Sequence, residues 1–150
     1  MKIPDWLVRI TSTFFYVGYL PFIPGTFGSV AGLGLYFLLK GNNFIYFTTV
    51  IALGILGFIF CGRAEKVFGK KDPKYAVIDE VVGTLISLAF IPYEIKWVVT
   101  GFFVFRLLDT LKPYPASKFQ RMHGSLGIMG DDIIAGIYTN IVLQIVLKLL

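Results

Sequence analysis

The sequence is poor in charged residues, in cysteine and in histidine. Only 15% of its 150 residues are Asp, Glu, Lys or Arg, and it contains one cysteine and one histidine. The single cysteine, Cys61, excludes an intrachain disulfide and a metal centre built on several cysteines. The low charge also argues against an ordinary soluble domain, because such a domain needs polar residues to cover its surface.

Apolar residues are abundant instead. Hydrophobic residues make up 56% of the chain and aromatic residues 17%, and the mean hydropathy is +0.75. The length indicates one domain, and the composition indicates that this domain lies in a membrane. We therefore predict an all-α fold, a helical integral membrane bundle in which residues 1–150 form a single membrane-embedded domain.

The spacing of prolines, glycines and charges divides the chain into helices. Residues 4–20 predict an amphipathic helix on the membrane surface rather than a cleaved signal, because Asp5 and Arg9 interrupt the apolar run. About five membrane helices follow, at 29–39, 44–60, 73–91, 96–111 and 131–150. Asp72 and Pro73 resemble the cap and first residue of the third of these helices. The first spans only roughly 17 to 20 Å, so it must tilt or stop part-way through a 30 Å hydrocarbon core.

Most basic residues lie near the N-terminus or in two segments between apolar runs, at 63–74 and 106–121. Cytoplasmic loops carry an excess of Lys and Arg, so we expect these segments and the N-terminus to be cytoplasmic. Five spans then bring four polar segments to the same membrane face, at 24–29, 79–80, 106–113 and 131–132. We predict that these segments share one site.

Five acidic residues stand at that face: Asp79, Glu80, Asp109, Asp131 and Asp132. The first two lie in an apolar run, which favours a metal or proton site over a structural ion pair. Asp109 follows Arg106 by one turn and can pair with it, and Asp131 can cap a helix. Taken together, however, five carboxylates would repel one another, and an oxygen-rich set of this kind suits Mg²⁺ or Mn²⁺.

Groups that bind phosphate accompany these acids. Gly25, Thr26 and Ser29 precede a predicted helix, where backbone N–H groups and hydroxyls bind anions, although the same residues also make a simple capped turn. Arg106 and Lys112 add positive charge, so the combination is typical of phosphoryl transfer. The only histidine, His123, is either the acid that protonates a leaving oxygen or a loop residue without a role.

Four motifs resemble, in order and spacing, those of the phosphatidylglycerophosphatase A family. They are PGTFGS at 24–29, IDEVVG at 78–83, FRLLDTLKPYP at 105–115 and HGSLGIMGDDIIAG at 123–136, and the similarity runs from about residue 23 to residue 138. The N-terminus is shorter than is usual there, and Gly130 replaces a larger apolar residue. The resemblance implies a magnesium-dependent bacterial membrane enzyme that converts phosphatidylglycerophosphate to phosphatidylglycerol and phosphate.

The resemblance also implies roles for individual residues. The family's acidic residues correspond to the five acids above, and its phosphate-loop residues to Gly25, Thr26 and Ser29. With Mg²⁺ held by some of the acids, either water attacks the phosphorus directly or Asp79 or Asp132 forms an aspartyl-phosphate. The expected partners are phosphatidylglycerophosphate and membrane lipid, with no nucleic acid. The expected location is the bacterial cytoplasmic (inner) membrane, crossed several times, with the active site facing the cytoplasm.

Two other classes of membrane protein share some of these features. A small ion or metal transporter also uses carboxylates within the membrane, but it would spread them through the membrane depth. A phosphatidyltransferase is also metal-dependent, but its Asp-Gly-x-x-Ala-Arg signature does not occur in this sequence. The phosphatase therefore explains the position of the acids best.

Overall fold

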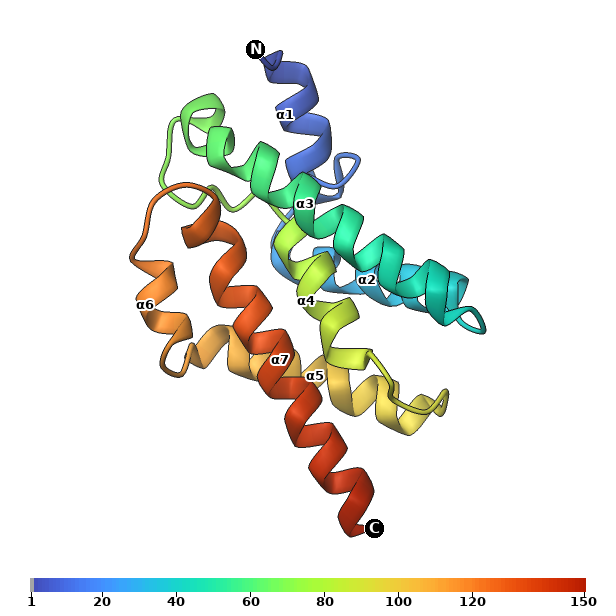
Figure 1. Cartoon of the computed structure of the whole chain (residues 1–150). Helices are drawn as coiled ribbons and strands as arrows, with labels where there is room; N and C mark the ends of the chain where they lie inside the picture. The colour runs from blue at the N-terminus through green and yellow to red at the C-terminus, as the bar shows by residue number, and fades with distance from the viewer. Residues whose placement is uncertain (1) are drawn as a thin grey trace.

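The computed structural model describes residues 2–150, which form seven α-helices and one short 3₁₀ helix and contain no β-strand. The all-α prediction is confirmed (Figure 1). In chain order the elements are α1 (Asp5–Ser12), η1 (Val17–Tyr19), α2 (Pro24–Leu39), α3 (Asn43–Phe68), α4 (Ile78–Leu88), α5 (Ile95–Leu111), α6 (Ala116–Gln120) and α7 (Ser125–Leu149).

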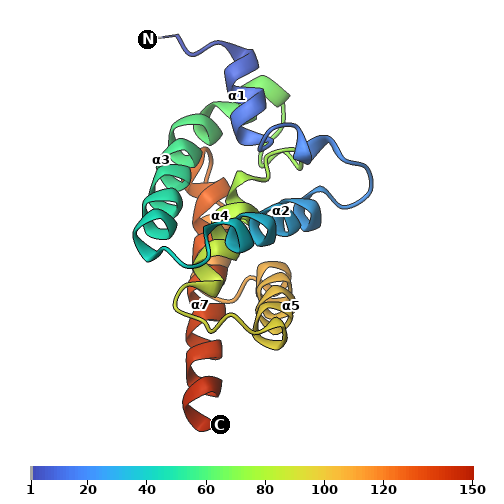
Figure 2. The ribbon, with the colours of Figure 1, turned by 90° about the vertical axis from the view of Figure 1, so that its right-hand side faces the viewer.

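The short helix α4 lies at the centre of the bundle. Figures 1 and 2 show α7, α2, α3 and α5 arranged around it. Nine of its eleven residues are buried, including Val82, Leu85 and Leu88 in the apolar core. Contact with α7 is close because Gly136 faces α4, where a Cβ atom would lie 2.6 Å from the carbonyl oxygen of Gly83.

Side chains from three other helices bind carbonyl groups at the C-terminal end of α4 and in the turn that follows it. The Asn140 amide of α7 donates to the carbonyls of Ile86, Ser87 and Ala89 at 3.2, 3.1 and 2.7 Å. The Tyr46 hydroxyl of α3 donates to the Leu85 carbonyl, and the Tyr36 hydroxyl of α2 donates to that of Ile91. A helix end leaves backbone groups unpaired, so these bonds allow α4 to end inside the protein.

Two helices are long and apolar enough to cross a membrane. They are α3 and α7, with 26 and 25 residues, and their most apolar 18-residue stretches have mean hydropathies of 2.3 and 1.5. Helices also form at the other three predicted segments, but α2, α4 and α5 have only 16, 11 and 17 residues. The predicted count of about five membrane helices is therefore not confirmed.

The N-terminal helix is shorter than the predicted 4–20, because α1 ends at Ser12. The hydroxyls of Ser12 and Thr13 donate to carbonyls four residues back, and Phe14 begins three residues in the left-handed region. The Ser12 carbonyl instead accepts from the backbone N–H of Val77 at 2.8 Å. These local side-chain hydrogen bonds and the long-range backbone bond compete with the hydrogen bonds that would extend the helix.

The start of the third apolar helix was predicted too early. Residues 73–77 run past α1 and η1, and α4 begins at Ile78, so Asp72 and Pro73 do not cap it. Asp79 and Glu80 therefore occupy its first turn instead of lying deep in a longer helix. The predicted basic loop is also partly helical, because α3 continues to Phe68 and includes Arg63.

The last helix was predicted too late. It begins at Ser125, so Asp131 and Asp132 lie about two turns inside α7 and do not cap it. The glycines that suggested a loop serve close packing, since a Cβ on Gly130 would meet the Phe119 ring of α6 at 2.6 Å. Gly130, which replaces the larger apolar residue usual in the family that the motifs resemble, thus allows a close contact between α6 and α7.

Candidate active site

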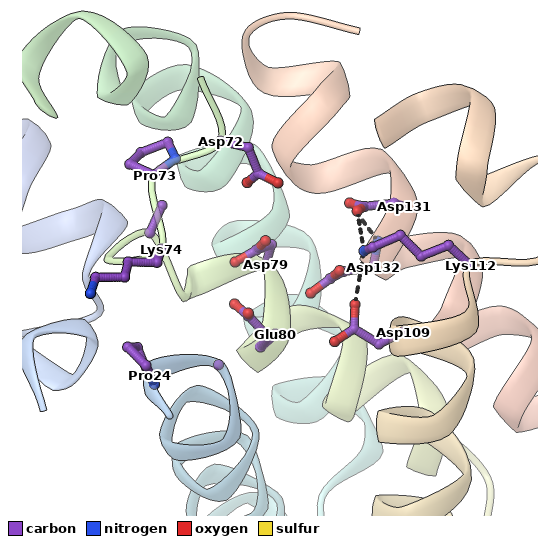
Figure 3. Close-up of a pocket in the computed structure, with 12 residues that line it drawn as sticks. Pro24, Asp72, Pro73, Lys74, Asp79, Glu80, Asp109, Lys112, Asp131 and Asp132 are labelled. Carbon is purple, nitrogen blue, oxygen red and sulfur yellow. Dashed lines mark hydrogen bonds and ion pairs between the residues drawn. The ribbon is translucent and has the colours of Figure 1, made fainter. Parts of the chain in front are cut away.

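A cavity of about 280 Å³ lies where four helices meet the loop 69–77. The first turns of α2 and α4, the last turn of α5 and the second turn of α7 contribute to it, and Figure 3 shows carboxylates from α4, α5 and α7 directed into the same space. Twelve residues line the cavity: Pro24, Gly25, Asp72, Pro73, Lys74, Ala76, Asp79, Glu80, Asp109, Lys112, Asp131 and Asp132. The structure thus brings all five predicted acids together.

Three of these acids have carboxylate oxygens without a protein partner. Asp79 and Asp132 are only 5% and 2% exposed, and Asp79 Oδ1, Glu80 Oε2 and Asp132 Oδ2 are buried without a hydrogen bond to any described residue. One oxygen from each residue lies within 4.8 Å of the others. Buried polar atoms normally have partners, so this set of oxygens calls for a ligand.

The other two acids form ion pairs with basic side chains. Lys112 Nζ lies 3.2 Å from Asp109 Oδ1 and 2.5 Å from Asp131 Oδ2. Arg106 Nη1 donates to Asp109 Oδ2 at 2.7 Å, which confirms the predicted i, i+3 pair. Asp109, Asp131 and Asp132 also place an oxygen each within 4.8 Å of one another, so Asp132 belongs to both carboxylate groups.

The end of α5 places Lys112 among the acids. Its backbone adopts a left-handed conformation (φ 47°) that ends the helix before Pro113. Burial alone would lower the pKa of the Lys112 ammonium, but Asp109 and the two aspartates of α7 outweigh burial and raise this pKa above its ordinary value. Lys112 is therefore a fixed positive charge beside the cavity.

The start of α2 forms the opposite wall. Pro24 is its first residue, and a Cβ on Gly25 would lie 2.7 Å from Glu80 Oε1 and 3.4 Å from an Arg106 nitrogen. Thr26 follows in the same turn and does not line the cavity. Ser29 is fully buried, and its hydroxyl donates to the Gly25 carbonyl at 3.2 Å. Gly25 thus allows the close approach of α2 to the acids.

His123 is not among the residues that line the cavity. Its side chain is 76% exposed, and its Nδ1 lies 3.4 Å from Glu65 Oε2 of α3. The predicted histidine therefore lies beside helix α3 rather than over the acids.

Sequence reasoning missed four residues of the loop 69–77 that line the cavity: Asp72, Pro73, Lys74 and Ala76. Asp72 and Pro73 matched a helix cap, and Lys74 was counted only as a cytoplasmic basic residue. No local pattern marks them as site residues, because the path of this loop depends on the distant bond between Val77 and Ser12.

Comparison with known proteins identifies the family. The family model of phosphatidylglycerophosphatase A matches residues 10–147. The chain belongs to the phosphatidylglycerophosphatase A family. Phosphatidylglycerophosphatase A of Escherichia coli is 39% identical over 80% of this chain and 72% of its own length, and that of Haemophilus influenzae is 41% identical over 79% and 76%.

A third relative carries a different name. A protein of Bacteroides thetaiotaomicron, named as a candidate phosphatidylinositol-3-phosphatase, is 34% identical over 97% of this chain and 96% of its own length. No solved structure matches the chain significantly. Membership of this family makes the chain a phosphatase, and its two long apolar helices together with these relatives indicate a membrane protein.

The residues present fit a divalent cation. The candidate donors are all carboxylate oxygens, and three of the residues that supply them have a buried oxygen without a protein partner. Mg²⁺ prefers oxygen ligands, and it commonly binds one or two protein carboxylates together with water and phosphate. A phosphatase cavity with this donor set can hold such an ion in contact with a phosphate group.

Proposed function

We propose that this protein hydrolyses phosphatidylglycerophosphate to phosphatidylglycerol and phosphate, in a reaction that depends on Mg²⁺. The observation that carries the proposal is the group of buried, unpartnered carboxylate oxygens of Asp79, Glu80 and Asp132 in a phosphatase of this family. Two of the three relatives above are named phosphatidylglycerophosphatase A, which supports the choice of substrate.

The five acids divide into two groups by their partners. Asp109 and Asp131 already face Arg106 and Lys112, so their charges are compensated within the protein. Asp79, Glu80 and Asp132 retain unpartnered oxygens. We therefore assign the cation to these three residues, with Asp109 and Asp131 holding the two basic side chains in place. When bound, Mg²⁺ would neutralise charge on the phosphate and favour attack at phosphorus.

Arg106 and Lys112 would bind the oxygens of the substrate phosphate. Both are fixed by charge-assisted hydrogen bonds, so they need little rearrangement when the phosphate arrives. The first N–H group of α2, at Gly25, would add a donor at the opposite wall. Ser29 would contribute indirectly, because its hydroxyl holds the Gly25 carbonyl.

We propose water as the nucleophile. Because Asp79 and Asp132 are assigned to the cation here, we give neither of them the further role of forming an aspartyl-phosphate. The water oxygen forms a bond to phosphorus while the bond from phosphorus to the glycerol oxygen breaks. The products are phosphate and the free hydroxyl of phosphatidylglycerol.

The proposed setting is the cytoplasmic face of the bacterial inner membrane. Basic residues gather around the same end of the bundle as the cavity, on the loop 69–77 and on α6 and the turn after it. Such residues favour the cytoplasmic side and attract anionic lipids. In this arrangement α3 and α7 cross the bilayer, and α2, α4 and α5 complete the predicted set of about five membrane helices as shorter segments.

The acids gather at this one end of the bundle, and the relatives are named as phosphatases, so the transporter alternative is not favoured. A second lipid substrate deserves direct comparison, because the Bacteroides relative is named for phosphatidylinositol 3-phosphate.

The test measures phosphate release by the purified protein in detergent from three lipids: phosphatidylglycerophosphate, phosphatidylinositol 3-phosphate and phosphatidic acid. We expect kcat/KM to be highest for the first lipid. A higher value for the inositol lipid would transfer the proposal to that substrate, and no release from any of them would refute it.

A further inference from the structure

Asp72 lines the cavity from a different element than the other acids do. It lies in the loop 69–77 between α3 and α4, and Figure 3 shows its carboxylate across from Asp131. Asp79 and Asp132 are almost fully buried, whereas Asp72 is exposed. Asp72 therefore stands at the mouth of the cavity, and the acids of α4 and α7 form its floor.

Two hydrogen bonds hold this part of the loop. Glu65 Oε1 of α3 accepts a hydrogen bond from the backbone N–H of Asp72 at 3.3 Å. The Lys71 ammonium donates to the Arg121 carbonyl at 2.8 Å. The backbone of Asp72 is also in the left-handed region (φ 46°), which non-glycine residues seldom adopt without support. Its position at the mouth is therefore set by the fold.

The other oxygen of Glu65 faces His123, the residue that the sequence suggested as an acid. His123 lies outside the cavity lining, and none of the described lining residues is a histidine. The same glutamate thus holds the loop that carries Asp72 and faces the loop that carries His123. Of the two, only Asp72 reaches the cavity.

If the proposed function is correct, the increase in burial from Asp72 at the mouth to Asp79 and Asp132 at the floor gives the orientation of the substrate. The terminal phosphate must reach the buried acids and Lys112, while the rest of the lipid extends through the mouth. In phosphoryl transfer the attacking and leaving oxygens lie roughly in line on opposite sides of phosphorus. The leaving glycerol oxygen then faces the mouth, on the side of Asp72.

We propose that Asp72 is a catalytic residue that protonates the glycerol oxygen as it leaves. The bond from phosphorus to that oxygen breaks, and the oxygen takes the carboxyl proton of Asp72. Water forms the new bond to phosphorus, and its proton leaves with the product phosphate. Solvent at the mouth then returns a proton to Asp72.

Four charged groups face Asp72, and on balance they favour its acid form. They are Asp131 of α7, Asp109 and Lys112 at the end of α5, and Glu65 of α3. Although Asp72 is exposed at the mouth, the protein around its carboxylate displaces part of the water there. This desolvation and then the Asp131 charge raise the pKa of Asp72 above its ordinary value, and Lys112 offsets part of the rise. A general acid works best when its pKa is brought toward the working pH.

The test compares two substrates that differ in one atom: phosphatidylglycerophosphate and its analogue with sulfur in place of the leaving glycerol oxygen. A thiolate is a far weaker base than an alkoxide and leaves without a proton. We expect Asp72→Asn to lower kcat about 10²- to 10⁴-fold on the oxygen ester, the usual contribution of a general acid, and to leave kcat on the sulfur analogue close to that of the parent.

Two further readouts distinguish proton transfer from a structural role. In the parent, kcat on the oxygen ester falls as the pH rises through the pKa of Asp72, because the acid form is lost, and Asp72→Asn lacks this decline. Asp72→Glu keeps a carboxyl group and recovers part of the activity. Asp5→Asn makes the same chemical change on α1, away from the cavity, and leaves kcat unchanged on both substrates.

Three outcomes would overturn the inference. Equal loss on both substrates with Asp72→Asn would assign Asp72 to binding or folding. A loss confined to the oxygen ester with His123→Gln, but not with Asp72→Asn, would return the acid role to His123. If the parent released no phosphate from either ester, the proposed function would fail, and this inference with it.

Discussion

Replacing Asp132 with asparagine should change stability in opposite directions with and without metal. Asp132 belongs to both carboxylate groups in the cavity, whose ligand oxygens lie within 4.8 Å of one another. Two unit charges at that distance repel by about 3 kcal/mol at an effective dielectric constant near 20. Proton uptake relieves part of this, so we expect Asp132→Asn to stabilise the metal-free protein by about 1–3 kcal/mol.

Mg²⁺ should stabilise the parent and not the variant. An ion present at 100 times its dissociation constant stabilises the folded state by about 2.7 kcal/mol. For a chain of this size that corresponds to a rise in Tm of roughly 5 to 10 °C. Asp132→Asn removes a central ligand, so its Tm should exceed that of the parent in EDTA and should rise little when Mg²⁺ is added.

The assay is thermal unfolding in detergent, followed by tryptophan fluorescence, in EDTA and across a Mg²⁺ titration. Asp5→Asn on α1 is the matched control, and it should respond to Mg²⁺ as the parent does. An equal rise in Tm for the parent and Asp132→Asn would place the cation elsewhere. A lower Tm for the variant in EDTA would contradict the calculated repulsion.

Three other substitutions test separate parts of the site and the fold. Lys112→Met removes the ammonium group that Asp109 and Asp131 share, and it should lower the free energy of unfolding by roughly 2–4 kcal/mol, measured by thermal unfolding. Lys112→Arg keeps the positive charge and should recover part of this loss. Asn140→Leu removes the donor to three α4 carbonyls and should cost about 1–3 kcal/mol, and Gln144→Leu on the same helix should not. Gly25→Ala places a Cβ atom 2.7 Å from a Glu80 oxygen, so it should weaken Mg²⁺ binding. The rise in Tm that Mg²⁺ produces should shrink, and by more than the Tm of the metal-free protein falls.

The sequence predicted helix type and placement well where apolar runs are bounded by strong breakers. The segment expected at 96–111 is helical over Ile95–Leu111, because Lys112 and Pro113 follow and the residue before a proline seldom stays helical. The prediction from sequence was wrong where contacts between distant residues decide where a helix begins. The backbone bond from Val77 to Ser12 draws residues 73–77 away from α4, and contact with Phe119 turns the glycines before Asp131 into packing positions.

The composition of the site was more predictable than its internal arrangement. The acids were visible because charge is costly in an apolar chain, and the structure brings all of them to one cavity. Their division into partnered and unpartnered groups depends on where Lys112 lies, and the sequence does not specify that position. Asp72 was not predicted as a site residue because Asp followed by Pro is also a common way to begin a helix.

Phosphate release from phosphatidylglycerophosphate, measured as a function of Mg²⁺ concentration on EDTA-treated protein in detergent, tests the central claim most directly. The arrangement of Asp79, Glu80 and Asp132 predicts no turnover in EDTA, saturable recovery as Mg²⁺ is added, and phosphatidylglycerol as the lipid product. Full turnover in EDTA, or no turnover at any Mg²⁺ concentration, would contradict it.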